Sequence, residues 1–327
     1  MIIVTGATGF VGSSLIRLLL AGGEEVRVLV RAGSDRRNLV GLDVEIAEGD
    51  LLKSETLKPA VAGCQGLYHV AADYRLWTRN PKQMFEANVG GSLAILRAAG
   101  DAGIERMVYT SSVATLGLVK NGVSDEKSPV GYADMIGVYK QSKFKAEEAV
   151  RKLINDDGLP VIIVNPSTPI GPRDIKPTPT GRMIVEAVAG RMPAFVDTGL
   201  NIAHVDDVAA GHILAYEKGQ IGERYILGGT DMELSEILAH IARFMGRKPP
   251  TIKIPHNVIL PIAYLAEAWT CITGGNDPFV VVDGVKMAKK KMFFSSAKAQ
   301  RDLGYRVRPA GDALDDAIKW FLAEGCF

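Results

Sequence analysis

The sequence predicts an α/β protein in which a doubly wound parallel sheet is followed by a smaller mixed α/β C-terminal lobe. Two observations support this fold class: short apolar runs alternate with amphipathic stretches from residue 2 to residue 164, and the alternation ends at Asn165. Parallel strands are buried on both faces, so they form continuous apolar runs, and helices connect them. The chain has 327 residues, of which 47% are hydrophobic, and can bury a large core.

The N-terminal segment predicts one strand–helix–strand unit. An apolar strand at residues 2–4 leads into a helix whose apolar residues recur at helical spacing over 15–19, before Gly22 and Gly23 end it. A second apolar run follows at residues 26–30. A unit of about 30 residues has the length that two parallel strands and a crossover helix require.

The turn between this strand and its helix carries three spaced glycines. Gly6 permits a tight bend, Gly9 lets backbone N–H groups approach a pyrophosphate, and Gly12 lets the helix pack close to the strand. A phosphate would bind at the helix N-terminus, where unpaired donors and the helix dipole favour negative charge. The segment therefore predicts a Rossmann-type dinucleotide site, with cofactor contacts at Gly6, Thr8, Gly9, Phe10, Val11 and Gly12.

The residue after the second strand distinguishes NADP from NAD. An acid there would accept a hydrogen bond from the 2′-hydroxyl of NAD, whereas this chain has Arg31, whose guanidinium can pair with a 2′-phosphate. Ser34, Arg36 and Arg37 are close enough in sequence to add donors. NADP is therefore favoured over NAD. The alternative is that this loop is simply solvated, with Asp35 as a partial counter-charge.

The following elements continue the alternation. Further strands are predicted at residues 43–47, 67–70, 106–110 and 160–164, and helices at 88–99 and 138–153. Such alternation predicts right-handed crossovers and a ligand site beyond the carboxyl ends of the strands.

A change in this rhythm predicts two lobes. Prolines and glycines are dense from residue 166 to 179, and later helices no longer alternate with strands. We assign residues 1–168 and about 205–228 to the NADP-binding Rossmann domain. Residues 169–204 and 229–327 would form the smaller substrate-binding lobe.

Composition indicates a small-molecule substrate. The net charge is +1, so no basic field indicates a nucleic acid partner. Cys64, Cys271 and Cys326 are scattered and lack ligand spacing, which fits a reducing cytoplasm without disulfides. His204 and His212 lack partners at ligand spacing, so no metal site is expected. The first strand begins at residue 2, which leaves no room for a signal peptide.

One late segment, residues 258–272, is apolar enough to suggest a membrane. Pro261 and Glu267 interrupt it, and it is too short to span a bilayer of about 30 Å. The sequence favours a core or lobe helix, and peripheral contact with a membrane surface is the alternative.

Other late features are expected to be structural. Trp269, Cys271 and Met287 are predicted to pack in the core of the smaller lobe. The basic run from residue 286 to 291 is predicted to be a solvated helix face, with a phosphate or anionic-membrane site as the alternative.

A tyrosine and a lysine four residues apart introduce the predicted chemistry. Tyr139 and Lys143 share one face of the helix at 138–153, after a hydroxyl-rich strand end at residues 110–112. In this order the sequence resembles the extended short-chain dehydrogenase/reductase family from Met1 to about Val208. The motifs that carry the resemblance are Thr-Gly-Ala-Thr-Gly-Phe-Val-Gly at 5–12, Gly-Asp-Leu at 49–51, Ala-Ala at 71–72, Asn-Val-Gly-Gly at 88–91, Thr-Ser-Ser at 110–112, Tyr-x-x-x-Lys at 139–143, Asn-Pro at 165–166 and His-Val-Asp-Asp-Val at 204–208.

The resemblance implies roles for individual residues. Tyr139 would be the general acid/base, with its pKa lowered by the positive charge of Lys143, which would also bind the nicotinamide ribose. Ser112 would bind and polarise the substrate oxygen, with Ser111 as the less favoured candidate. Further cofactor contacts would come from the adenine-side Asp50 and Leu51, from Ala71, Ala72 and Thr110 along the trough, and from Pro166, Ser167 and Thr168 near the carboxamide.

The resemblance leaves three functions open. A reductase similar to dihydroflavonol 4-reductases would bind NADPH, deliver hydride and release NADP, and Arg31 favours it. A nucleotide-sugar epimerase or dehydratase would retain its cofactor. A non-catalytic redox sensor is the third function, which the presence of Ser112, Tyr139 and Lys143 disfavours. The family resemblance also implies a homodimer that uses the helix at 138–153.

Three segments bear on the substrate. Residues 200–203 stand where sugar epimerases of this family often carry an Arg-Asp-Tyr-like run, which argues against a UDP-sugar. The segments at 71–77 and 302–309 are similar to the hopanoid-associated sugar epimerase group, which implies a sugar or polyol linked to a terpenoid lipid. Substrate contacts are expected from residues that otherwise would pack the lobe interface: Asp73, Tyr74, Arg75 and Trp77.

Overall fold

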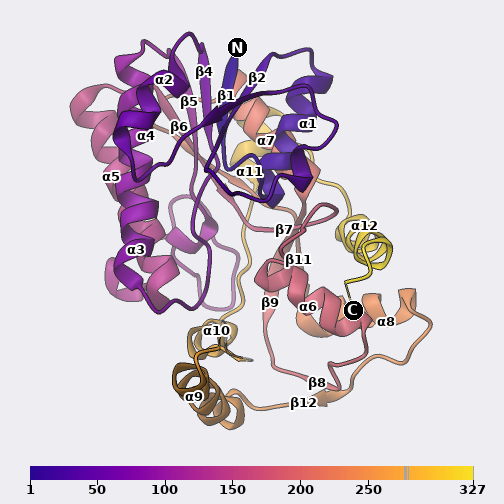
Figure 1. The fold of residues 1–327 in the computed structure, drawn as a ribbon. Helices are drawn as coiled ribbons and strands as arrows, with labels where there is room; N and C mark the ends of the chain where they lie inside the picture. Colours follow the sequence, from indigo (N-terminus) through magenta and orange to yellow (C-terminus); the bar gives the residue numbers. More distant parts are fainter. Residues whose placement is uncertain (276–277, 279, 327) are drawn as a thin grey trace.

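The computed structural model describes residues 1–275, 278 and 280–326. Its largest element is a seven-stranded sheet with the strand order β10-β6-β5-β4-β1-β2-β3 (Figure 1). Every neighbouring pair is parallel, and the order reverses between β1 and β4, which confirms the doubly wound fold class. The strands are β1 (Ile2–Thr5), β2 (Val26–Val30), β3 (Glu45–Glu48), β4 (Gly66–His69), β5 (Arg106–Thr110), β6 (Val161–Pro166) and β10 (Arg224–Leu227).

Helices cover both faces of this sheet (Figure 1). On one face Val4 and Val28 pack beneath α1 and α7, and on the other Ile3 and Leu29 pack beneath α4 and α5. Burial of both faces explains why the strands are continuous apolar runs. The helices are α1 (Phe10–Ala21), α7 (Val205–Lys218) and α11 (Ala297–Leu303) on the first face, and α2 (Leu57–Val61), α4 (Gly91–Asp101) and α5 (Gly137–Asp157) on the second.

The remaining elements form a smaller part with its own core, which includes Ile202, Ile237 and Ile318. A three-stranded sheet has the order β11-β9-β7, and β8 pairs with β12. The α9 and α10 helices form a separate pair at the outer end of the molecule (Figure 1). The bounds in this part are β7 (Thr168–Ile170), β8 (Ala194–Phe195), β9 (Gly199–His204), β11 (Thr230–Glu233), β12 (Ile252–Lys253), α6 (Pro179–Val188), α8 (Leu234–Phe244), α9 (His256–Thr273), α10 (Val282–Ala288) and α12 (Ala310–Ala323). The short helix α3 (Pro81–Phe85) lies outside this part and packs against α5.

Most of the predicted elements are present with shifted bounds. The strand expected at 160–164 continues to Pro166, because β10 pairs with its last two residues. The helix expected at 88–99 begins as a π-helical turn at Glu86–Gly90 and continues as α4. The α7 helix and β10, which belong to the segment 205–228, join the large sheet and its helix layer, as does α11. The division into two lobes stays a prediction.

The expectation that Trp269 and Cys271 lie in a core is wrong. Both are exposed on α9, and Met287 is half-buried. The fully buried residues of α9 are the small Ala263 and Thr270, with Ile259 and Leu260 packed partly beside them, and the side that carries Trp269 points outward. Within the described residues, no helix is both long enough and apolar enough to cross a membrane. Among them, no group of three or more His, Cys, Asp or Glu side chains could hold a metal ion.

Replacement of Gly12 by alanine tests the close approach of α1 to β1. The added Cβ would lie 2.2 Å from the carbonyl oxygen of Gly6, which is backbone and cannot rotate away. We expect the free energy of unfolding to fall by about 1–3 kcal/mol, the usual effect of overpacking, in a urea titration. Gly90→Ala is the matched control, since nothing lies within 4 Å of its added Cβ. Equal losses in the two variants would contradict the prediction.

Candidate active site

The first part of the site is the glycine turn between β1 and α1. Gly6 has a φ of +71°, and a Cβ there would lie 2.6 Å from the backbone nitrogen of Ala71. A hydrogen bond from Gly9 N to Gly6 O, 3.0 Å long, closes the turn. Gly9 caps α1 without a side chain, so the N–H groups of Phe10 and Val11 face no capping oxygen. This cradle fits the pyrophosphate of a dinucleotide.

Three arginines beyond β2 differ in their partners. Arg36 pairs with Glu48 at 2.6 Å, and Arg37 pairs with Asp35 at 2.8 Å. Hydrogen bonds from Arg37 lower the pKa of Asp35 to about 2, so this acid is committed to Arg37. The Arg31 side chain is exposed and has no hydrogen-bond or ion-pair partner in the part of the chain that the structure describes. Its guanidinium therefore remains available where the adenosine ribose is expected.

Two other positions of the expected cofactor site lie beside Arg31 and the glycine turn. The backbone N–H of Ser34 donates to Arg31 O at 3.1 Å, which places both residues on one turn. The carbonyl of Thr8 accepts a hydrogen bond from Asn38 Nδ2 at 3.2 Å. These contacts join the loop after β2 to the glycine turn.

The ends of β1 and β4 are tied together by buried polar groups. Thr5 Oγ1 accepts a hydrogen bond from Ala71 N at 3.2 Å and lies 2.7 Å from His69 Nδ1. His69 Nε2 lies 2.8 Å from Ser92 Oγ, and burial lowers the pKa of this histidine to about 3. The neutral ring therefore acts as a bridge that holds Ala71 beside the glycine turn.

The remaining predicted cofactor contacts lie at the ends of β3 and β6. Asp50 Oδ1 accepts a hydrogen bond from Leu52 N at 3.0 Å, and Leu51 packs against Gly91. The Oγ atom of Ser167, between Pro166 and Thr168, is buried and has no hydrogen-bond partner among the described residues. Such an orphaned hydroxyl suits a polar ligand group. Together with the glycine cradle, these residues fit a nicotinamide dinucleotide.

Lys143 is buried on α5 and points at the end of β5. Its Nζ donates to Thr110 O at 2.8 Å and lies 3.4 Å from the hydroxyl of Tyr109. Burial lowers the pKa of Lys143 to about 8, while the nearby Glu147 acts in the opposite direction. This lysine therefore changes charge in a pH range that can be measured.

The Tyr139 phenol meets the side chain of Ser112. Burial raises the pKa of Tyr139, and the hydrogen bond with Ser112 opposes that rise. The expectation of a lowered pKa is therefore wrong for this structure, because burial has the larger effect, while the Lys143 ammonium is directed at Thr110 O. A phenol with a raised pKa keeps its proton at neutral pH and can donate it.

Sequence reasoning missed Glu147, which is buried one turn after Lys143. Its Oε2 accepts hydrogen bonds from Ser111 Oγ at 2.5 Å, Thr115 Oγ1 at 2.8 Å and Asn165 Nδ2 at 2.9 Å. Burial acts to raise the pKa of this carboxyl, but its hydrogen-bond donors and Arg224 hold it below the usual value. The available signal was spacing, since Tyr139, Lys143 and Glu147 recur every four residues on one helix face.

The Glu147 network also separates the roles of two neighbouring serines. The Ser111 hydroxyl is committed to Glu147, whereas the Ser112 side chain meets Tyr139. Asn165, which binds Glu147, donates a second hydrogen bond to Ser112 O at 3.0 Å. The network therefore holds the backbone of Ser112 in place.

The segment with the expected substrate contacts is anchored by Asn88. Its side chain accepts a hydrogen bond from Asp73 N at 2.7 Å and donates one to Asp73 O at 2.8 Å. Arg75 Nη2 donates to Asp73 Oδ2 at 2.5 Å, so these two side chains lie together. Tyr74 is exposed and Trp77 is half-buried, so both offer ring surface to a ligand.

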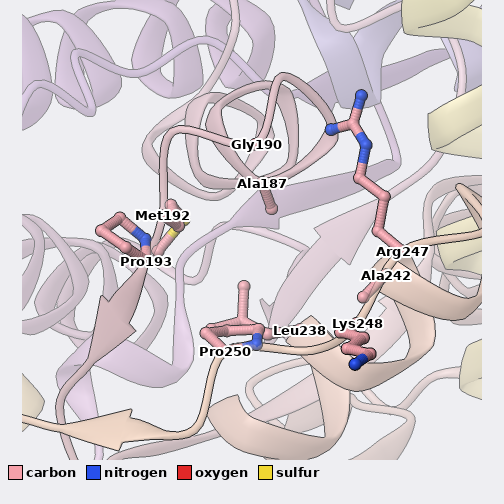
Figure 2. Close-up of a pocket in the computed structure, with 9 residues that line it drawn as sticks. All are labelled: Ala187, Gly190, Met192, Pro193, Leu238, Ala242, Arg247, Lys248 and Pro250. Carbon is pink, nitrogen blue, oxygen red and sulfur yellow. The ribbon is translucent and has the colours of Figure 1, made fainter.

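A cavity of about 200 Å³ lies elsewhere, between α6 and α8 (Figure 2). Arg247, one of its lining residues, donates from Nη1 to Val188 O at 2.6 Å. The cavity is lined by Ala187, Gly190, Met192, Pro193, Leu238, Ala242, Arg247, Lys248 and Pro250, none of which is a predicted site residue.

Comparison with known proteins identifies the family. Residues 2–228 match the NAD dependent epimerase/dehydratase family. A Synechocystis protein provisionally named dihydroflavonol 4-reductase is 44% identical, over 98% of this chain and 94% of the relative. Sterol demethylase protein B of Methylococcus capsulatus is 34% identical, over 99% of this chain and 98% of the relative. A Stigmatella aurantiaca ketoreductase is named for 4-hydroxy-2-methyl-3-oxo-4-farnesyl-3,4-dihydroquinoline-1-oxide. It is 30% identical, over 97% of this chain and 95% of the relative.

Solved structures agree with this grouping. The crystal structure of gox2253 is 51% identical and superposes with a TM-score of 0.89, over 99% of this chain and 98% of that chain. PA4631, described as a nucleoside-diphosphate-sugar epimerase from Pseudomonas aeruginosa, is 25% identical with a TM-score of 0.80, over 100% of this chain and 98% of that chain. The chain therefore belongs to the NAD dependent epimerase/dehydratase family and is an NAD(P)-dependent enzyme of the short-chain dehydrogenase/reductase type.

Proposed function

We propose that this protein is an NADPH-dependent carbonyl reductase whose catalytic residues are Ser112, Tyr139 and Lys143. The observation that carries the proposal is the contact between the Ser112 and Tyr139 side chains beside the buried Lys143. This group lies at the carboxyl end of β5, at the same sheet edge as the glycine turn. The names of the Synechocystis and Stigmatella relatives, both reductases, support reduction as the reaction.

The side chains present can perform the proton half of such a reaction. NADPH, when bound, supplies the hydride. The Tyr139 phenol would donate its proton to the substrate oxygen as the carbonyl becomes a hydroxyl. The Ser112 oxygen accepts a hydrogen bond from Ala114 N at 3.1 Å, so its hydroxyl acts as a donor, to Tyr139 in this structure and to the substrate oxygen when a substrate is bound. Lys143 adds a positive charge that stabilises negative charge in the site.

We further propose that the substrate is a ketone on an apolar ring or a terpenoid lipid. One relative is named for a farnesyl-bearing quinoline ketone and another for a sterol. The exposed Tyr74 and half-buried Trp77 offer apolar ring surface near the site. The similarity of residues 71–77 and 302–309 to the hopanoid-associated group supports the same class.

A nucleotide-sugar epimerase or dehydratase that retains its cofactor is the second candidate. The family match and the name of PA4631 favour it. It ranks second because residues 200–203 in β9 carry no arginine for a nucleotide diphosphate. A cytoplasmic location and a homodimer through α5 are also proposals, and the free state of Cys64, Cys271 and Cys326 supports the first.

The reductase proposal predicts that the purified protein oxidises NADPH when an apolar cyclic ketone is added. Tyr139→Phe should lose this turnover, by at least about 100-fold, since it removes the proton donor, while NADPH binding measured by fluorescence stays unchanged. Denatured wild-type protein should release less than one nucleotide per chain, measured by mass. One retained NAD per chain, without ketone turnover, would support the epimerase or dehydratase instead.

Replacement of Arg31 by alanine tests the choice of NADP. Loss of charge-assisted hydrogen bonds to a 2′-phosphate should weaken NADPH binding by about 10- to 100-fold and leave NADH binding nearly unchanged, by titration calorimetry. Arg36→Ala is the matched control, because Arg36 already pairs with Glu48. An equal loss for NADPH and NADH would exclude a 2′-phosphate contact.

The charge of Lys143 predicts the pH dependence of turnover. Its pKa is lowered from the usual 10.5 to about 8, so the ammonium is present below pH 8 and lost above it. We expect kcat to fall as the pH rises through about 8, whereas Tyr139, with a raised pKa, stays protonated. The measurement is a pH profile of kcat at saturating NADPH, with circular dichroism to verify folding. A profile that stays flat to pH 10 would contradict a role for this charge.

A further inference from the structure

The α9 helix presents an apolar face that no other described residue covers. Its side chains recur every three or four residues on one side of the helix, and we call them the apolar stripe: Val258, Ile262, Leu265, Trp269 and Ile272. Leu265 is 71% exposed, Trp269 68% and Ile272 80%. The stripe is about 21 Å long at the rise of an α-helix. Single exposed apolar residues are common, but a continuous face of this kind indicates a binding surface.

The packing of α9 on α10 explains why the stripe points outward. The buried residues of α9 are Ala263 and Thr270, both small, and Ala263 clusters with Val282 and Val285 of α10. A helix that completes a core turns its large apolar residues inward. In α9 only Ile259 and Leu260 among the large apolar residues pack partly against the cluster with α10, whereas the apolar stripe stays exposed and is placed for contact with something outside the described chain.

One flank of the apolar stripe is basic. Lys289 Nζ donates to Asn257 Oδ1 at 3.4 Å, and Lys286 Nζ lies 5.9 Å from the centre of the Tyr264 ring. Asn257 and Tyr264 are seven residues apart and therefore lie on one side of α9, next to the stripe. We call Lys286 and Lys289 the lysine flank.

Two described acids near this surface have partners, and for one of them the partner is a lysine of the flank. Glu267, the one acid in the α9 sequence, accepts a hydrogen bond from Val282 N at 2.7 Å and so turns toward α10. Asp283 lies 3.8 Å from Lys286, a partly exposed pair that is weak in water. The surface therefore combines a long apolar face with a net positive border.

We propose that α9 docks this protein onto a bilayer that contains anionic phospholipid. The apolar stripe would enter the boundary between headgroups and acyl chains, and the lysine flank would lie among the phosphates. Trp269 and Tyr264 are residue types that membrane–water interfaces favour. A bilayer matches this surface better than a protein partner does, because among the described residues the apolar stripe is bordered by two lysines and, besides Glu267, which turns toward α10, by only one nearby acid, Asp283. The proposal goes beyond the proposed reductase activity and does not depend on it.

The docking surface is connected to the segment with Trp77 and to the start of α5. Arg79, which follows the segment with Trp77, donates to Thr270 O at 3.0 Å and Gly275 O at 2.8 Å at the C-terminal end of α9. At the start of α5, a Cβ on Gly137 would lie 2.6 Å from Asp283 Oδ2, so α10 touches that helix two residues before Tyr139. A docked protein would thus hold the substrate side of its site close to the lipid.

The test is sedimentation of the full-length protein with vesicles of phosphatidylcholine alone or with phosphatidylglycerol. We expect binding to mixed vesicles and at least about tenfold less binding for Leu265→Glu/Trp269→Glu, because two charges would enter the apolar boundary. Val40→Glu/Ile221→Glu is the matched control, since both positions are exposed apolar residues away from α9. The temperature of thermal unfolding and the affinity for NADPH should be the same in all variants. Misfolding would then be excluded as the cause of any loss of vesicle binding.

A second pair of variants tests the lysine flank. Lys286→Glu/Lys289→Glu should lower the affinity for mixed vesicles by about tenfold or more, given about 1 kcal/mol for each lysine near an anionic surface. Lys58→Glu/Lys152→Glu has the same change in net charge on α2 and α5 and should bind as the wild type does. If the control lost as much vesicle affinity, net charge alone would explain the effect, and the proposed docking surface would be overturned.

Three results would overturn the proposal. In the first, the wild-type protein stays in the supernatant with both kinds of vesicle. In the second, the α9 variants bind vesicles as the wild type does. In the third, no vesicle binding is seen, and sedimentation velocity shows that the α9 variants dissociate a dimer. The last result would assign the stripe to a second copy of the chain. Ketone turnover, measured with a water-soluble substrate, is independent of these outcomes, so failure of the docking proposal and failure of the reductase proposal are distinguishable.

Discussion

The buried carboxylate of Glu147 is the interaction on which the geometry of the site depends. It lies on α5 and accepts hydrogen bonds from residues after β5, from β6 and, through Arg224, from β10. A charge without partners in such a place would destabilise the fold by about 3–5 kcal/mol. Because its donors come from separate strands, the carboxylate stabilises one alignment of α5 against the sheet, and that alignment sets where Tyr139 meets Ser112.

At the glycine turn, close backbone contacts fix the geometry of the site. The close approach of Gly6 to Ala71 and of Gly12 to Gly6 leaves no room for side chains. The helix N-terminus and the strand ends are thereby brought to one place, where a dinucleotide can reach both. The site thus combines a rigid polar network under Tyr139, the proposed proton donor, with a rigid backbone cradle at the glycine turn.

The large sheet and the α9 helix differ in how much of their apolar surface is buried. The large sheet buries its apolar side chains on both faces, whereas α9 buries only small residues fully and leaves the apolar stripe exposed. Arg79 ties α9 to the segment with Trp77, where substrate contacts are proposed, so the exposed helix and that segment form one connected region. The proposed apolar substrate is physically consistent with an apolar surface at this end of the molecule, because both avoid water.

By itself the sequence determined the features that depend on local pattern. Continuous apolar strand runs, a glycine triplet at fixed spacing and a Tyr-x-x-x-Lys pair are visible without coordinates, because neighbours in sequence set them. Tertiary structure alone decided which charges are already paired. Arg36 and Arg37 have nearby acids while Arg31 has none in the described chain, and Ser111 rather than Ser112 is committed to Glu147. It also decided that α9 is exposed, since an apolar helix becomes core or surface only through what packs against it.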